Sequence, residues 1–83
     1  LRCRPIGDTE FDSCPAGILR MDGGQASIVV QNQRGVQFTI NFMSDYVNAT
    51  NREVTATFDE DTWTVTIDND EVYEVPLAAV EGD

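Results

Sequence analysis

The sequence predicts an all-β fold, a small antiparallel meander of about five or six strands that forms a barrel or a sandwich. After Cys14, apolar and polar residues alternate in one segment after another, and short groups of turn-forming residues separate these segments. Such alternation is typical of antiparallel strands with one buried and one solvated face. A chain of 83 residues is short enough to predict one domain, residues 1–83, with no substantial helix.

The elements follow in order along the chain. The apolar pair Ile18 and Leu19 opens the first strand, and the next strands are expected in the segments ASIVVQ (26–31), VQFTINF (36–42), EVTATF (53–58), TWTVTI (62–67) and EVYEV (71–75). The turns between them are expected at DGGQ (22–25), QNQRG (31–35), DED (59–61) and DND (68–70). Tyr46 and Val47 fit either a further short strand or a loop. Residues 76–83 predict a short C-terminal cap of one helical turn, beginning at Pro76 and ending at Gly82.

Cys3 and Cys14 are the two cysteines of the chain, and ten residues that include a proline and a glycine separate them. We predict a disulfide that closes the N-terminal segment, residues 1–14, because such a cross-link stabilises a small domain. A zinc site is not expected, since the chain has no histidine. A reactive thiolate is not favoured either, because the nearby Asp12 disfavours ionisation of the Cys14 thiol. Free, unreactive cysteines are the remaining alternative.

The two cysteines and the identity of the first residue also indicate where the protein is located. An even cysteine count in a short chain is typical of proteins from oxidising compartments, and a chain that begins at Leu1 is expected to be a processed or excised segment. We therefore expect a periplasmic or secreted protein. No run approaches the roughly 18 apolar residues that cross a bilayer, so no membrane insertion is expected.

The negative charge is concentrated in the second half of the chain. The net charge is −10, and residues 43–83 carry Arg52 against eleven carboxylates. Such a surface repels phosphates, so nucleic acid is not an expected partner. Two interpretations remain: the acidic residues keep the protein soluble, or they steer a basic protein partner.

The acidic turns are the candidate partner or calcium surface. They consist of Asp59, Glu60 and Asp61 in one turn and of Asp68, Asp70 and Glu71 in the next. The strand between them spans roughly 17–20 Å, so the two groups are not expected to share one ion. Neither matches a calcium-binding hand, which needs a central glycine and a glutamate at position twelve. Solvated turn residues are the simplest interpretation, with weak calcium binding as an alternative.

Enzymatic chemistry is not expected from this composition. Without histidine and lysine the chain lacks the usual general bases and a Schiff-base amine, which leaves carboxylates alone for acid–base catalysis. No cofactor is expected. Trp63 and Tyr73 alternate with apolar neighbours, so core packing is the first interpretation of both. If exposed, they form a candidate aromatic surface for a sugar or a protein.

Two segments carry a resemblance to known proteins. The segments CPAGILR (14–20) and EVYEVPLAAVEGD (71–83) bracket the predicted strands. In this pattern the chain resembles small uncharacterised exported proteins of Gram-negative bacteria. The resemblance implies a periplasmic or secreted setting and a β-rich domain, and it brings no catalytic residue.

Three hypotheses for the function follow. The first is a non-catalytic exported domain that binds or accompanies another protein. A basic protein is the expected partner. The second is a calcium-dependent structural or adhesive module, and the third is an enzyme that works through carboxylates alone. A purely structural domain is the remaining alternative.

Overall fold

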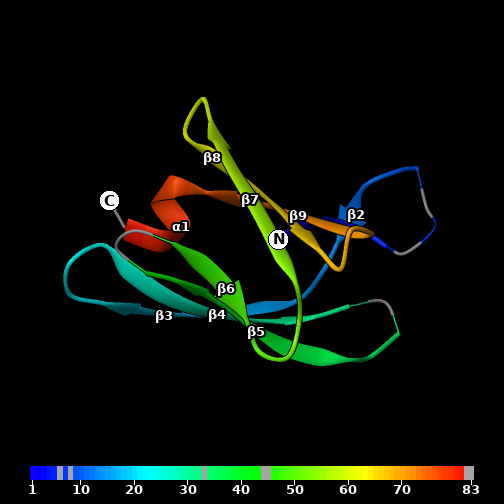
Figure 1. Cartoon of the computed structure of the whole chain (residues 1–83), viewed down its shortest axis with the longest axis horizontal. Coiled ribbons are helices and arrows are strands. Elements are labelled where there is room, and N and C mark those ends of the chain that lie inside the picture. The colour runs from blue at the N-terminus through cyan, green and yellow to red at the C-terminus, as the bar shows by residue number, and fades with distance from the viewer. Residues whose placement is uncertain (6, 8, 33, 44–45, 82–83) are drawn as a thin grey trace.

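The computed structural model describes residues 1–5, 7, 9–32, 34–43 and 46–81 and is an all-β structure of two antiparallel sheets (Figure 1). Its strands are β1 (Arg2–Arg4), β2 (Asp12–Ser13), β3 (Ala16–Met21), β4 (Gln25–Gln31), β5 (Gln37–Phe42), β6 (Val47–Ala49), β7 (Val54–Asp59), β8 (Thr62–Ile67) and β9 (Glu71–Pro76), and they precede one helix, α1 (Leu77–Glu81). The sheet orders are β2-β1-β9-β8-β7 and β3-β4-β5-β6. The predicted all-β class is therefore confirmed, in its sandwich form.

The strand order differs from one continuous meander. Strands β3 to β6 and strands β7 to β9 are two separate meanders, and β1 pairs with β9 although the two lie at opposite ends of the sequence. The described residues contain nine strands, more than the five or six expected. The additional ones are β1, β2 and β6, which have only three, two and three residues. Strand β6 begins at Val47 and is the short strand that the sequence left open there, whereas β1 and β2 carry too little alternation to be recognised in the sequence.

The core lies between the inward faces of the two sheets. From β4 and β5 the inward residues are Ala26, Ile28, Val30, Phe38, Ile40 and Phe42, and from the other sheet they include Cys3, Val65, Ile67, Tyr73 and Val75. The alternation predicted for 36–42 holds from Phe38 onward, whereas Val36 precedes the strand and is exposed. Most polar residues of the same strands face outward, as the period-two pattern requires, and Glu71 of β9 is the buried exception among the described residues.

The disulfide attaches the N-terminal segment to this core. Cys3 and Cys14 are bonded and both are buried, and Cys3 is paired with Tyr73 across β1 and β9. The Leu1 amino group donates to the carbonyl of Cys14, which closes the segment further. The predicted bridge is thus confirmed. It is typical of proteins from oxidising, non-cytoplasmic environments.

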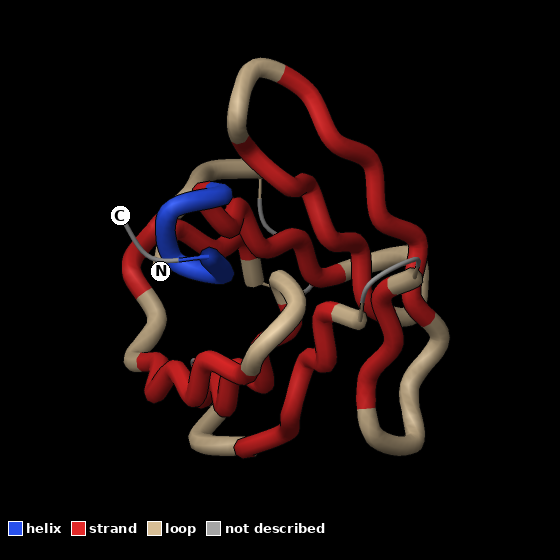
Figure 2. The backbone as a smooth tube through the Cα atoms, turned by 90° about the vertical axis from the view of Figure 1, so that its left-hand side faces the viewer, coloured by secondary structure: helices blue, strands red, loops and turns tan. Residues whose placement is uncertain are grey.

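The helix α1 covers one open end between the sheets (Figures 1 and 2). It begins at Leu77, directly after the end of β9 at Pro76, so Pro76 belongs to the strand rather than to the predicted first helical position. Val80 is its buried residue, and Arg20 of β3 donates to the carbonyls of Ala78 and Ala79. The predicted end at Gly82 lies outside the described residues.

Candidate functional site

The hairpin of β7 and β8 extends beyond the rest of the molecule and forms its uppermost part in both views (Figures 1 and 2). Glu60 and Asp61 form its two-residue turn and have φ values of 48° and 67°. Two consecutive left-handed residues match the right-handed twist of the flanking strands, which explains the tight connection. Asp59, Glu60 and Asp61 are all exposed at this tip, as the sequence predicted for solvated turn residues.

An exposed aromatic ring lies in the same hairpin, at the residue that directly precedes these three carboxylates. Phe58 is 47% exposed, and its ring centroid is 5.1 Å from that of Trp63, its cross-strand partner. Trp63 is half-buried and contacts Phe42 of the other sheet at 5.8 Å between ring centroids. Trp63 therefore joins the hairpin tip to the core and positions Phe58. We call the tip residues Phe58, Asp59, Glu60, Asp61 and Trp63 the acidic tip.

The turn of the acidic tip is attached to the C-terminal segment. The amide of Leu77 donates to the carbonyl of Asp61 at 2.9 Å, which links the turn to the beginning of α1. This hydrogen bond uses a backbone group and leaves the Asp61 carboxylate exposed. The tip thus presents three carboxylates and one apolar ring from a hairpin that is held at its turn.

The second acidic turn, between β8 and β9, uses its carboxylates within the protein. Asp68 accepts from the amide of Glu53 at 2.9 Å and pairs with Arg52 at 3.4 Å. The carboxylate of Asp70 accepts from the amide of Gly7 at 3.2 Å, and its carbonyl accepts from Arg4. These two aspartates hold neighbouring segments in place. They are therefore poorer candidates for a partner surface than the acidic tip.

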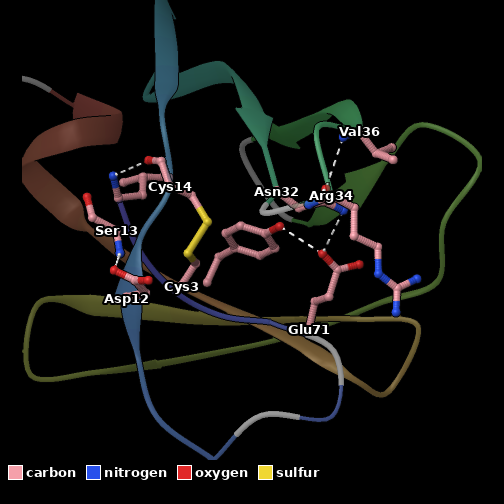
Figure 3. Close-up of a disulfide and its surroundings, with 10 residues drawn as sticks. Cys3, Asp12, Ser13, Cys14, Asn32, Arg34, Val36 and Glu71 are labelled. Carbon is pink, nitrogen blue, oxygen red and sulfur yellow. Dashed lines mark hydrogen bonds between the residues drawn. A yellow bond between two sulfur atoms is a disulfide. The ribbon is translucent and has the colours of Figure 1, made fainter.

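Glu71 does not belong to a surface at all. Its side chain is 2% exposed on the inward face of β9, whereas the sequence predicted a residue of the acidic turn. One of its carboxylate oxygens, Oε1, accepts from the Tyr73 hydroxyl at 3.0 Å and from the Asn32 amide at 3.2 Å (Figure 3). Its other oxygen lies 3.8 Å from the guanidinium of Arg52. The register of β8 and β9 pairs Glu71 with buried Ile67, and this pairing turns the carboxylate inward.

The buried network joins three separate regions of the chain. Asn32 lies after β4, Arg52 lies between β6 and β7, and Glu71 and Tyr73 lie on β9. Asn32 also accepts from the amides of Arg34 and Val36, so its side chain shapes the connection from β4 to β5. The Arg52 guanidinium lies over the ring of Phe38 at 4.9 Å from its centroid. The network is thus a polar contact between the two sheets rather than an open site.

Tyr73 is buried as well, at 1% exposure, so it does not contribute to an aromatic surface. Its ring lies 5.7 Å from that of Phe38, which confirms the interpretation as core packing. Burial raises the pKa of its hydroxyl above the ordinary value of 10.0, and the nearby Glu71 carboxylate raises this pKa further. The folded protein therefore retains the phenolic proton at a pH at which the unfolded chain loses it.

This shift predicts a pH dependence of stability. Because the pKa of the Tyr73 hydroxyl is raised in the folded state, the protonated hydroxyl contributes its full share to the free energy of unfolding below about pH 10. This contribution is lost as the pH rises above that value, since the unfolded chain then releases the proton. We expect the free energy of unfolding to fall more steeply above pH 10 in the wild-type chain than in Tyr73→Phe. Urea unfolding of both proteins between pH 8 and pH 11 would measure this difference, and parallel pH profiles would contradict it.

The two acidic turns are separate, as the sequence predicted. They lie at opposite ends of β8, and among the described residues no three cysteine or carboxylate side chains converge to hold a metal ion. Sequence reasoning did not select Phe58, Asn32 or Arg52. Phe58 could have been found, since a hairpin that turns at residues 60 and 61 places it opposite Trp63.

Comparison of the chain with protein-family models, with curated proteins and with solved structures found no match. In the part of the chain that the structure describes, no helix has the length and the apolar character needed to cross a membrane.

Proposed function

We propose that this chain is a non-catalytic binding domain of the periplasm or the extracellular space, and that it binds a basic protein through the acidic tip. The observation that carries the proposal is an exposed phenyl ring and three exposed carboxylates on one projecting hairpin. The Cys3–Cys14 disulfide supports the oxidising compartment. The resemblance to exported proteins of Gram-negative bacteria agrees with it.

The acidic tip suits the side chains of lysine and arginine. Each has an apolar stem that packs on an aromatic ring and a charged head that pairs with carboxylates. Phe58 offers the ring, and Asp59, Glu60 and Asp61 offer the carboxylates. The net charge of −10 adds a long-range field that increases the association rate with a basic protein.

The test is a triple variant, Asp59→Asn, Glu60→Asn and Asp61→Asn. Asparagine tolerates the left-handed conformation of residues 60 and 61, so the turn is retained while three charges are removed. We expect the affinity for basic probe proteins, lysozyme and ribonuclease A, to fall about tenfold at low ionic strength. Isothermal titration calorimetry would measure the affinity, with serum albumin as the acidic probe that does not bind.

A matched control removes three carboxylates elsewhere, in Glu10→Gln, Asp22→Asn and Glu81→Gln. Its net charge equals that of the tip variant, so it is expected to lose no more than about twofold in affinity. Phe58→Ala is expected to weaken binding at low and at high salt alike, because the contact of an apolar ring is not screened. Equal losses in the two triple variants, or no salt-sensitive complex with either basic probe, would contradict the proposal.

A further inference from the structure

Strand β3 is an unprotected edge of the four-stranded sheet. It pairs with β4 on one side and, among the described strands, has no neighbour on the other. All six of its residues are exposed, and the large apolar ones are Ile18, Leu19 and Met21, with 40%, 65% and 41% of their surface exposed. An edge strand of this length and character favours pairing with a further strand.

The backbone groups at this edge can be assigned residue by residue. The amide of Gln31 donates to the carbonyl of Pro15, so Pro15 belongs to a hydrogen-bonded pair with β4. Because such pairs alternate in an antiparallel ladder, Gly17, Leu19 and Met21 also direct their backbone groups toward β4. The amides and carbonyls of the intervening residues, Ala16, Ile18 and Arg20, therefore point toward the free edge.

The charges of the molecule leave this edge accessible to a second copy. Strand β3 contains no carboxylate, and the guanidinium of its one charged residue, Arg20, is bound to carbonyls of α1. The outward face beside it is uncharged and consists of Gly17, Leu19, Met21, Gln25, Ser27, Val29, Gln31, Gln37, Thr39, Asn41 and Asn48. By contrast, the other long edge strand, β7, ends in Asp59 and follows Glu53, so two copies would repel one another there.

Gly17 leaves room for a side chain of a partner strand. It has an ordinary negative φ, and a methyl group placed on it would meet no atom within 4 Å, so neither backbone nor packing requires a glycine here. A shallow hollow of about 240 Å³ lies over Gly17, Pro15 and Val29 and extends to Gln37. An apolar side chain from a strand beside β3 would enter this hollow.

We propose that two copies of this chain form a two-fold symmetric dimer through antiparallel pairing of their β3 strands. Ile18 pairs with Ile18 of the second copy, and Ala16 pairs with Arg20, so all the free backbone groups of these residues are satisfied. In the same register Leu19 of each copy lies opposite Gly17 of the other and covers the hollow. The two four-stranded sheets become one continuous sheet, and the acidic tips remain exposed.

The size of the contact predicts a weak dimer. A six-residue strand is about 20 Å long, and one strand pair with a few side chains buries less area than the roughly 1,600 Å² of a standard stable interface. The net charge of −10 on each copy also opposes association. We therefore expect a dissociation constant on the order of 100 μM at physiological ionic strength, and a tighter dimer in higher salt.

Sedimentation equilibrium over a concentration series tests the dimer. We expect the mass of the wild-type chain to rise from 9.2 kDa toward twice that value as the concentration increases. Leu19→Lys should remain monomeric, whereas Thr57→Lys, with the same charge change on exposed β7, should dimerise like the wild type. A wild-type chain that remains monomeric up to about 1 mM, or a Leu19→Lys variant that dimerises normally, would overturn the proposal.

The register has its own test, which does not depend on the folding of Leu19→Lys. Gly17 and Leu19 of two copies form a non-hydrogen-bonded pair with Cα atoms about 4.5 Å apart, close enough for a disulfide. The pairs Gly17–Gly17 and Leu19–Leu19 are diagonal, at about 7–8 Å, and too far apart for one. A mixture of Gly17→Cys and Leu19→Cys should therefore give mainly the mixed covalent dimer on mild oxidation, as identified by intact mass.

The two single variants are the controls for this cross-linking. Each alone should remain largely uncross-linked, and the buried Cys3–Cys14 bridge should be retained. Efficient self-cross-linking of Leu19→Cys would overturn the register, and absence of the mixed dimer would overturn the strand pairing. Neither result depends on the basic partner, because the acidic tip takes no part in this contact.

Discussion

Replacing Glu71 with alanine is expected to lower the free energy of unfolding by about 3–4 kcal/mol. The buried carboxylate accepts hydrogen bonds from the Tyr73 hydroxyl and from the Asn32 amide, and alanine would leave both donors without this acceptor. The guanidinium of Arg52 would also lose its neighbour at 3.8 Å. For a chain of this size, such a loss corresponds to a decrease of roughly 15–20 °C in melting temperature.

Glu74→Ala is the matched control, because Glu74 lies on the same strand and also pairs with an arginine. The ion pair between Glu74 and Arg2 is at the surface, with 35% and 63% of the two side chains exposed. We expect Glu74→Ala to cost less than about 1 kcal/mol. Urea unfolding of both variants measures the difference, and equal losses would show that the buried network contributes little.

Glu71→Gln separates the charge of Glu71 from its hydrogen bonds. The glutamine oxygen can still accept from Tyr73 and Asn32, while the negative charge near Arg52 is removed. We expect a loss intermediate between those of Glu74→Ala and Glu71→Ala. A loss as large as that of Glu71→Ala would assign the stabilisation to the charge rather than to the acceptor.

Removing the disulfide is expected to cost about 3 kcal/mol in the double variant Cys3→Ala, Cys14→Ala. The bridge spans a sequence separation of 11 residues, and the chain-entropy relation assigns that amount to a loop of this length. Small domains have about 0.05–0.15 kcal/mol of stability per residue, so this loss is a large part of the total. Strands β1 and β2 lie within or beside the closed segment and should be the first to separate.

Two measurements distinguish this effect from general unfolding. Urea unfolding gives the free energy, and hydrogen exchange reports separately on β1 and on the meander of β3 to β6. We expect lost protection in β1 and retained protection in β4 and β5, which pair only within their own sheet. A loss of less than about 1 kcal/mol would mean that the hydrogen bonds between Leu1 and Cys14 hold the segment without the bridge.

Features that depend on neighbouring residues were predicted from the sequence, whereas features that depend on distant residues were not. Alternation in 36–42, 53–58 and 62–67 located strands correctly, because side chains of a strand take opposite faces whatever the rest of the chain does. The turns at 22–25, 59–61 and 68–70 were also predicted, as was the connection at 31–35, of which residue 33 lies outside the described residues. Several residues of these turns adopt the left-handed conformation that glycine, asparagine and aspartate tolerate. The Cys3–Cys14 bridge followed from two cysteines and a short chain.

The candidate site was predicted only in part. Asp59, Glu60, Asp61 and Trp63 lie together at the acidic tip, because their place in one hairpin is a local property of the sequence. Glu71 and Tyr73 were expected at or near a surface by one interpretation, and both are buried. Their environment comes from Asn32 and Arg52, which are 39 and 19 residues before Glu71 in the sequence.

The β class, most of the long strands and turns, the disulfide and the acidic character of the second half could thus be predicted from the residues alone. Four features became known only from the folded chain: β1 pairs with β9, Glu71 points inward, Phe58 is exposed near the hairpin turn, and β3 is an open edge. The physical reason is that alternation fixes which residues share a face, whereas burial depends on which other segment covers that face. That choice is made by contacts between distant parts of the chain.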